Sequence, residues 1–258
     1  RTWRIRIMSD LRVNNITNSG GGTGPVIAGI STVSSAAFII MPSGNTEVRG
    51  AGSGRGAFGG GRDNPTYYAD MNFVEIATTG NGQDFGDMDA AKNGILGGTA
   101  SSTRGIVAGG YVGSPGAVVS TIIFYTSSSA GGANNFGDLT AANNQAAGAS
   151  NNRLAIFAGE YPSYKQRSLQ YVTIATTGDA TLFGDLVGTD IASGGISSPT
   201  RGIIHGIDRN GPTLKMTQFF EIATKGNAED FGELLNAYKA QAGASSSTRG
   251  LSMAGYIN

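Results

Sequence analysis

The chain has 258 residues, of which 14% are charged, and its 18 acidic and 18 basic side chains cancel. Phosphate binding needs a concentrated positive face, and no run of Lys or Arg is present, so nucleic acid is not an expected partner. Cysteine is absent, which excludes disulfides, thiolate nucleophiles and zinc–thiolate sites. The longest apolar stretch, residues 36–41, is far shorter than the roughly 20 residues that span a bilayer, so we expect no membrane insertion.

The first part of the chain, residues 1–45, does not follow the pattern of the remainder. A glycine-rich linker at residues 20–24 is followed by two apolar stretches, residues 25–30 and 36–41, which we expect to form strands. We therefore treat residues 1–45 as an N-terminal segment that contributes strands to the body of the protein.

From residue 46 to residue 258 the sequence repeats a unit of about fifty residues, and the fold follows from that unit. One anchor of the unit is an arginine, found at Arg55, Arg104, Arg153, Arg201 and Arg249. The other is Phe-Gly-Asp or Phe-Gly-Glu, found at Phe85, Phe136, Phe183 and Phe231. Such a period, rich in glycine and β-forming residues, predicts an all-β fold, a β-propeller with one four-stranded blade per unit.

Each unit contains four expected strands. The first is made of small residues, as at 145–150 and 241–245, which suits the crowded inner edge of a blade. A Ser-Ser-Thr turn leads to the second strand, Arg-Gly-Ile-Val-Ala, which ends in glycines. The third strand, as at 73–77 and 171–175, is dense in strand-forming residues. A Gly-Asn or Gly-Asp turn then returns the chain through the Phe-Gly motif, which lies on the fourth strand.

The first and second strands occur five times in the sequence, whereas the third and fourth occur four times. We expect the N-terminal segment to supply the missing pair, so that residues 25–42 pair with residues 240–257. The result is five four-stranded blades, one of them a composite blade closed by N- and C-terminal strands, with no open sheet edge.

This order of strands resembles the kelch repeat over residues 46–258. In that family a small first strand is followed by an aliphatic strand that ends in a glycine pair, and a large aromatic residue lies on the fourth strand. The glycine pair is present at 59–60 and 109–110 and is degraded in the later units, and phenylalanine replaces the usual tryptophan. We expect the phenylalanines to be wedges between adjacent blades, because burial of each is worth about 1.5–3 kcal/mol.

Nearly the whole chain also resembles virion structural and tail-fibre-like proteins of bacteriophages, in particular those that infect marine cyanobacteria. The resemblance rests on the N-terminal segment followed by units of the form Thr-Arg-Gly-Ile-Val-Ala-Gly-Gly-Tyr and Ile-Ala-Thr-Thr-Gly-Asn…Phe-Gly-Asp. It implies a homo-oligomeric appendage on the surface of the extracellular particle, with residues 1–45 also available for docking to other virion proteins.

The sequence offers little for catalysis. His205 is the only histidine, no nucleophile motif accompanies it, and we expect it to be a packing residue. The kelch resemblance raises copper radical oxidases, whose Tyr-Cys crosslink and several histidines are incompatible with this composition. The repeated acids after Phe-Gly could suggest a ring of metal ligands, but a role at strand ends is the stronger interpretation; they are Asp87, Asp138, Asp185 and Glu233. The repeated arginines are likewise expected to bond backbone carbonyls or a neighbouring blade. We therefore expect no enzyme, metal or cofactor.

The connections from second to third strand differ most between units: residues 62–70, 111–118, 161–167 and 208–215. Each contains one proline, and strand direction predicts that all four emerge on one rim. Tyrosine offers an apolar face with a polar tip, which suits contact with carbohydrate or protein. The candidate ligand-binding residues are Tyr67, Tyr68, Tyr111, Tyr161, Tyr164, Asp208 and Arg209. For Tyr111 an alternative remains, that it only covers a glycine-rich strand end.

Two functions are compatible with this interpretation. In the first, a non-enzymatic virion appendage presents the loops of the propeller to a host surface glycan or envelope protein. In the second, a purely structural protein that decorates or connects the capsid or tail uses the same loops to bind other virion proteins. A glycan-acting enzyme would need clustered carboxylates in one loop group, and only Asp70, Glu160 and Asp208 are offered, scattered over three loops.

Overall fold

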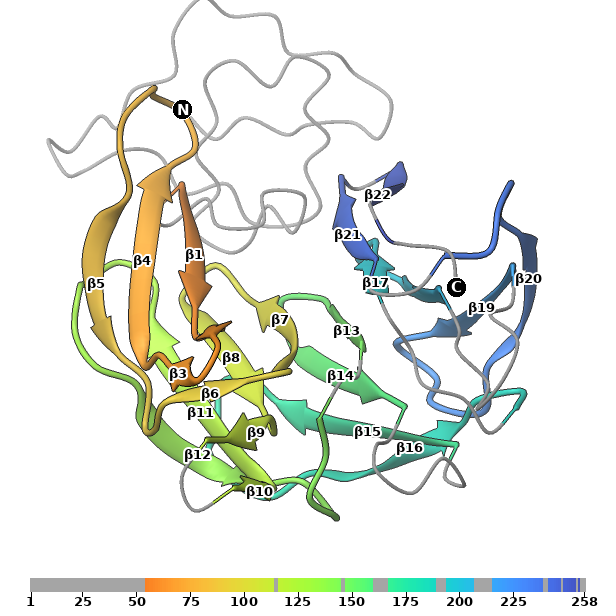
Figure 1. Cartoon of the computed structure of the whole chain (residues 1–258). Helices are drawn as coiled ribbons and strands as arrows, with labels where there is room; N and C mark the ends of the chain where they lie inside the picture. The colour runs from red at the N-terminus through yellow and green to blue at the C-terminus, as the bar shows by residue number, and fades with distance from the viewer. Residues whose placement is uncertain are drawn as a thin grey trace, which may run out of the picture. The chain divides into compact units, whose positions relative to one another are not determined.

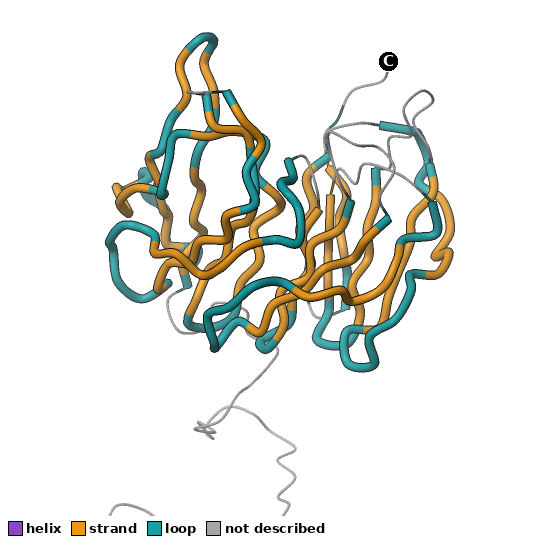
Figure 2. Tube along the Cα trace, turned by 90° about the horizontal axis from the view of Figure 1, so that it is seen from below, coloured by secondary structure: helices purple, strands orange, loops and turns teal. Residues whose placement is uncertain are grey.

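The computed structural model describes residues 54–255, except 114–115, 145–146, 160–166, 189–193, 207–214, 239–240, 247 and 254. The chain divides into two units, Arg1–Gly44 and Asn45–Asn258, and every described residue belongs to the second. The described residues form strands, turns and loops (Figure 2), so no helix among them could cross a membrane. The N-terminal segment, with the apolar stretches expected to close the ring, lies outside them.

Each repeat of the sequence forms one antiparallel sheet, and we number these sheets I to V in chain order (Figure 1). Sheet I contains β1 (Arg55–Gly59), β4 (Asp70–Glu75) and β5 (Gln83–Asp87). Sheet II contains β7 (Leu96–Ala100), β8 (Arg104–Ala108), β11 (Thr121–Thr126) and β12 (Asn134–Asp138). Sheet III contains β13 (Ala147–Ser150), β14 (Leu154–Ala158), β15 (Ser168–Thr173) and β16 (Thr181–Asp185). Sheet IV contains β17 (Gly194–Ser197), β18 (Arg201–His205), β19 (Met216–Glu221) and β20 (Glu229–Glu233), and sheet V contains β21 (Ala242–Ser245) and β22 (Gly250–Met253).

The strands lie side by side in chain order within each sheet, so the all-β class and the four-stranded unit were predicted correctly. Sheets II, III and IV are complete, whereas sheet I shows only a second, third and fourth strand and sheet V only a first and second. Closure of the five sheets into a ring is not seen in the described part of the chain.

The first strands of successive sheets, β7, β13, β17 and β21, lie next to one another. Small residues are required there, as expected from the sequence. A Cβ atom on Gly148 would lie 2.1 Å from the carbonyl oxygen of Gly97, and one on Gly195 would lie 2.2 Å from that of Gly148. These distances are far below van der Waals contact, so only glycine allows the strands to approach this closely.

Serine hydroxyls connect the same strands. Ser197 Oγ donates to the carbonyl oxygen of Ser150 (2.9 Å) and accepts from its N–H (3.0 Å). Ser245 Oγ bonds the N–H and carbonyl of Ser197 in the same way, at 3.2 and 2.9 Å, and Ser150 Oγ bonds those of Ala100, both at 3.2 Å. Sheets III, IV and V thus each hold the backbone of the preceding sheet through one serine hydroxyl.

The Phe-Gly motif of the fourth strand is a β-bulge. In sheet II, Ile122 pairs with Gly137 and Ile123 with Asn135, so Phe136 has no partner across the strands. Phe85, Phe183 and Phe231 are unpaired in the same way in their own sheets. A bulge re-aims the side chain, and Phe85, Phe136 and Phe183 are at most 5% exposed. They fall in apolar clusters that include residues of the next sheet, which confirms the expected wedges for these three. Phe231, the fourth, is 52% exposed and does not fill this role among the described residues.

The glycine of the motif allows the backbones of neighbouring sheets to meet. A Cβ atom on Gly137 would lie 2.4 Å from the carbonyl oxygen of Gly178, in the turn between the third and fourth strands of sheet III. In that turn, Gly178 N–H donates to Phe136 O and Ala180 N–H donates to Asp138 O, both at 2.8 Å. Equivalent hydrogen bonds join sheet I to sheet II and sheet III to sheet IV. The motif is therefore an inter-sheet joint.

Three of the repeated arginines stack on the third strand of their own sheet. The guanidinium carbons of Arg55, Arg104 and Arg201 lie 4.4–4.6 Å from the ring centroids of Phe73, Phe124 and Phe219. Arg104 also donates to the carbonyls of Ile174 and Ala175 in the next sheet, both at 3.0 Å. The expectation that these arginines bond carbonyls of a neighbouring sheet is thus confirmed for Arg104.

Arg153 departs from this pattern and corrects the sequence interpretation. Leu154, not Arg153, closes the turn from Asn151, in the place that Arg104 has relative to Ser101. The turn has the same length as in sheet II, but the arginine comes one position earlier, at the place of Thr103, and so lies outside β14. In sheet III the cation comes from the next sheet instead, because Lys225 Nζ lies 4.0 Å from the Tyr171 ring centroid and bonds its hydroxyl. This hydrogen bond lowers the pKa of Tyr171.

The close approach of the first strands gives a testable difference between two glycines. We expect Gly148→Ala to lower the free energy of unfolding by about 1–3 kcal/mol, because its methyl group would overlap the backbone of β7. Gly98→Ala, on β7, meets nothing within 4 Å and should change stability by less than about 1 kcal/mol. Urea denaturation followed by circular dichroism measures both. Equal effects of the two substitutions would contradict the packing described above.

Candidate binding rim

Three connections between strands meet beside sheets I and II. The connection from β1 to β4 folds into a hairpin of β2 (Arg62–Asp63) and β3 (Thr66–Tyr67). The connection from β8 to β11 forms β9 (Tyr111–Val112) and β10 (Ala117–Val118), and β9 also pairs with β6 (Lys92–Asn93). Since β6 belongs to the link between the two sheets, the variable connections of neighbouring sheets are held together.

The tyrosines of these connections come together. The ring centroids of Tyr67 and Tyr111 lie 5.9 Å apart, with the ring planes tilted by 37°. A Cβ atom on Gly113 would lie 2.1 Å from the Tyr67 ring, so this glycine lets the ring lie against the backbone of the neighbouring loop. Both tyrosines are partly buried, and Tyr68 is 40% exposed. We call Arg62, Tyr67, Tyr68 and Tyr111 the tyrosine rim.

Arg62 adds positive charge to this surface. Its Nη1 donates to the Tyr67 hydroxyl at 3.4 Å, and its guanidinium carbon lies 5.7 Å from the centroid of the Tyr67 ring. The arginine is exposed, so its remaining N–H groups are available to a ligand. The rim thus combines aromatic faces, a hydroxyl and guanidinium donors, a set that binds sugars or polar protein surfaces by stacking and hydrogen bonding.

Lys92 lies beneath the tyrosine rim and organises it. Its side chain is buried, forms an ion pair of 2.8 Å with Asp89 and donates to Thr121 Oγ1 at 3.4 Å. Its backbone carbonyl accepts from Gly61 N–H (3.0 Å), and its N–H donates to the carbonyl of Tyr68 (3.2 Å). Because a buried charge is tolerated only when it is paired, this lysine fixes the link between the two connections. The sequence analysis missed Lys92, although a single charged residue after two alanines was a signal of a buried charge.

The structure brings together three of the seven predicted site residues, Tyr67, Tyr68 and Tyr111. Of these three, Tyr67 and Tyr111 are in ring contact. The other four, Tyr161, Tyr164, Asp208 and Arg209, lie outside the described residues. Of the carboxylates after Phe-Gly, Asp138 accepts from Ser120 Oγ at 3.0 Å. Among the described residues no group of three or more His, Asp or Glu side chains could hold a metal ion.

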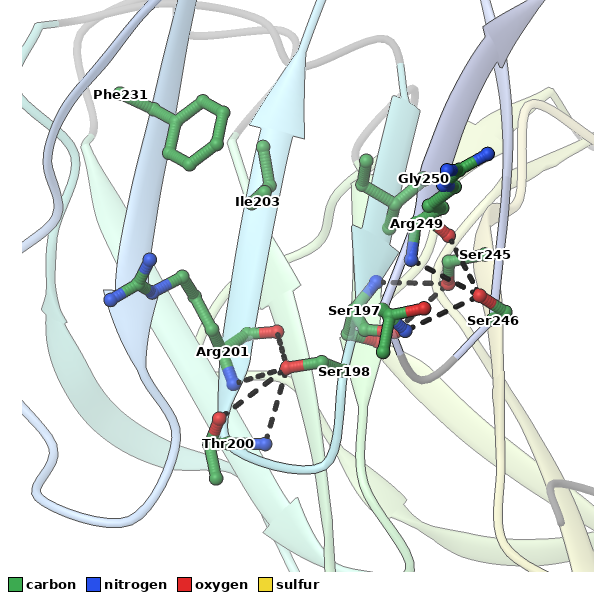
Figure 3. Close-up of a pocket in the computed structure, with 12 residues that line it drawn as sticks. Ser197, Ser198, Thr200, Arg201, Ile203, Phe231, Ser245, Ser246, Arg249 and Gly250 are labelled. Carbon is green, nitrogen blue, oxygen red and sulfur yellow. Dashed lines mark hydrogen bonds between the residues drawn. The ribbon is translucent and has the colours of Figure 1, made fainter. Parts of the chain in front are cut away.

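Apart from the tyrosine rim, a hollow lies between sheets IV and V (Figure 3). It has a volume of about 250 Å³ and is lined in part by Ile196, Ile203, Phe231 and Gly250, with the turns of Ser198 and Ser246 at one end. A neighbouring hollow of about 230 Å³ shares these four residues and extends to His205 and Ser252. We call the two together the C-terminal groove. Nothing in the sequence analysis predicted it.

His205 is buried, as expected of a packing residue. Its Nδ1 lies 3.0 Å from Ser252 Oγ and 3.4 Å from Gln241 Oε1, and its Nε2 has no hydrogen-bond partner among the described residues. Burial lowers the pKa of His205 below its ordinary value of 6.5, and the hydrogen bond with Gln241 opposes this only in part. Burial therefore favours the neutral imidazole in the folded protein.

This shift predicts a pH dependence of stability. The unfolded chain takes up the proton near pH 6.5, whereas the folded protein does so only at a lower pH, so protonation favours unfolding in between. We expect stability to be complete above about pH 7 and to fall as the pH drops through 6.5 towards the folded pKa. The urea midpoint should therefore fall between pH 7.5 and pH 5.5 in the native chain and change less in a His205→Gln variant. Identical pH profiles of the native chain and the variant would contradict the assignment of this pH dependence to His205.

No protein-family model matches the chain, and no curated protein matches it. The tyrosine rim and the C-terminal groove are therefore defined by their geometry alone.

Proposed function

We propose that the chain is a kelch-like β-propeller of five four-stranded blades. Sheet V contributes a first and a second strand, and residues 25–42 supply the third and fourth strands of this composite blade. The support is the recurring joint between sheets, because the same bulge, glycine contact and turn hydrogen bonds connect I to II, II to III and III to IV. An interface that repeats with one geometry closes into a ring when its rotation allows.

The proposed function is a non-enzymatic virion appendage that attaches to the host cell surface. The observation that carries it is the tyrosine rim, where aromatic side chains of neighbouring sheets meet beside an exposed arginine, above the buried Lys92 and its ion pair with Asp89. Rigid aromatic residues lose little rotamer freedom on binding, and a preorganised loop loses less entropy than a free one. A glycan or an envelope protein of the host is the ligand class that fits such a surface. The virion context comes from the resemblance of the repeats to tail-fibre-like proteins.

The tyrosines test the attachment proposal. We expect Tyr67→Ala, Tyr68→Ala, Tyr161→Ala and Tyr164→Ala, combined in one chain, to leave the fold intact and to reduce adsorption to the target cell at least about tenfold, the effect of losing 1.4 kcal/mol. Circular dichroism checks the fold, and binding of labelled protein to cells measures adsorption. A Ser102→Ala, Thr103→Ala variant, altered in a turn between first and second strands, serves as the control.

Undiminished adsorption of the folded tyrosine variant, or loss only in the Ser102, Thr103 control, would refute the assignment of the rim. If the tyrosine variant instead fails to join other virion proteins while cell adsorption is unchanged, the loops serve assembly. That outcome would favour the purely structural function, a decorating or connecting protein of the capsid or tail.

Deletion of residues 1–42 tests closure. A two-stranded sheet is marginal alone, so sheet V should lose its order when its partner strands are removed, and the free energy of unfolding should fall by several kcal/mol, about the value of a few buried apolar side chains. Differential scanning calorimetry of the two chains measures the change. An unchanged melting temperature would show that residues 1–42 are a separate docking segment.

A further inference from the structure

Phe231 is the one bulge phenylalanine that lacks cover. It is 52% exposed, whereas Phe85, Phe136 and Phe183 are at most 5% exposed. Phe231 retains the neighbour in its own sheet, because its ring centroid lies 6.0 Å from that of Phe219. What it lacks, among the described residues, is a side chain from the third strand of the next sheet, and the C-terminal groove is the space that remains.

The missing side chain can be identified from the complete joints. Phe85 meets Tyr125 of the next sheet at a centroid distance of 5.1 Å, and Phe183 meets Phe220 at 5.4 Å. Phe136 lies in one apolar cluster with Val172, at the same place in the third strand of sheet III. The position that covers a bulge phenylalanine therefore carries an aromatic or branched side chain.

The partner of this position on the second strand decides how large the covering side chain can be. Tyr125 pairs with Gly105 and Phe220 with Gly202, whereas the smaller Val172 pairs with Ala155. A Cβ atom on Gly105 would lie 2.0 Å from the Tyr125 ring, and one on Gly202 would lie 2.4 Å from the Phe220 ring. Glycine thus leaves room for an aromatic ring but does not require one, because in sheet I the glycine at this position, Gly56, pairs with Val74.

In sheet V this position of the second strand is Gly250. It follows Arg249 as Gly202 follows Arg201, and it pairs with Ser245 as Gly202 pairs with Ser197. The third strand of sheet V therefore has room for an aromatic residue opposite Gly250 and against Phe231, as in sheets II and IV.

The turn after the third strand adds a spacing rule. In each complete joint a glycine lies six residues after the covering residue and donates its N–H to the carbonyl of the bulge phenylalanine: Gly131 to Phe85, Gly178 to Phe136 and Gly226 to Phe183. The next residue of the turn is Asp179 in sheet III and Asn227 in sheet IV. Their side chains accept from the N–H groups of Asp138 and Asp185, both at 3.0 Å. The required segment is thus an aromatic or branched residue followed, at the sixth and seventh positions, by Gly and preferably Asn or Asp.

One aromatic residue in the first 53 positions meets these conditions. These positions contain two aromatic residues, Trp3 and Phe38. The residue six positions after Trp3 is Ser9, whereas Phe38 is followed at that spacing by Gly44 and then by Asn45.

We propose that residues 36–46 occupy the C-terminal groove as the third strand of sheet V, with Phe38 opposite Gly250 and against Phe231. This proposal rests on the ring closure proposed above and fixes its register. In this register Gly44 N–H donates to the carbonyl of Phe231, and Asn45 Oδ1 accepts from Glu233 N–H.

The same register places Ile39 opposite Arg249. At this place in sheets I and IV, Glu75 forms an ion pair with Arg55 (2.8 Å) and Glu221 with Arg201 (2.7 Å). An acidic residue is therefore accepted at position 39 and is rejected at position 38, where a carboxylate would be buried against Phe231 without a partner.

Two neighbouring substitutions in the full chain test this register. We expect Phe38→Glu to lower the urea midpoint and to abolish hydrogen-exchange protection of the amides of β22, whose outer edge would lose its partner strand. Ile39→Glu should leave both unchanged or raise the midpoint, and a rise should disappear when Arg249→Gln is added. Because a slip of one residue exchanges the two side chains, the opposite result would overturn the register.

A double-substitution cycle of Phe38→Leu with Phe231→Ala provides a milder measurement if Phe38→Glu does not fold. The two changes should be non-additive, and additive effects would refute the contact. If deletion of residues 1–42 destabilises the protein while Phe38→Glu and the cycle have no effect, ring closure stands and this register is wrong. If neither has an effect, both proposals fail. If light scattering instead shows a dimer, and the Phe38 variants dissociate it, a second copy of the chain supplies the strand. That result would also overturn the proposal, which assigns the strand to the same chain.

Discussion

The bulge in the fourth strand is the feature on which the other contacts between sheets depend. By leaving one phenylalanine without a cross-strand partner, it turns the ring towards the next sheet, and the following glycine brings the two backbones within hydrogen-bonding distance. One unit of a repeat fold cannot bury its apolar face alone and needs its neighbours to form a continuous core. Each sheet therefore takes its core from its neighbour, and the order of the sheets follows the order of the chain.

The arrangement of the surface connections also depends on the joint between sheets. Tyr67 can lie against the loop of sheet II only because the joint between sheets I and II has already fixed the distance between them. Lys92 then connects the two loops, with its backbone on the side of sheet I and its side chain on Thr121 of sheet II. The variable residues are thus carried by a rigid base, which is how binding residues on loops are commonly positioned.

The sequence predicted the class of the fold because its signals are local: small residues in the first strands, β-forming residues in the third, and Phe-Gly at a fixed interval. It misplaced Arg153 because a shift of the arginine by one position within a turn of equal length leaves the spacing of the arginines almost unchanged while moving the residue out of the strand. It also missed Lys92, because the burial of a lysine depends on Asp89 and Thr121, which other parts of the fold bring to it. For the rim, sequence gave the residue types, and only the structure shows which of them touch.

The serine contacts between the first strands have a directional consequence. Each hydroxyl bonds both the N–H and the carbonyl of the equivalent residue in the preceding sheet, so the two faces of a sheet are not interchangeable. Contacts of this head-to-tail kind specify which face meets which, but they contain no information about how many units follow. Duplication or loss of one unit of about fifty residues would leave this kind of serine contact in place between the sheets that remain. In the closed ring proposed above, the number of sheets is therefore limited by the rotation at each joint and not by the serine contacts.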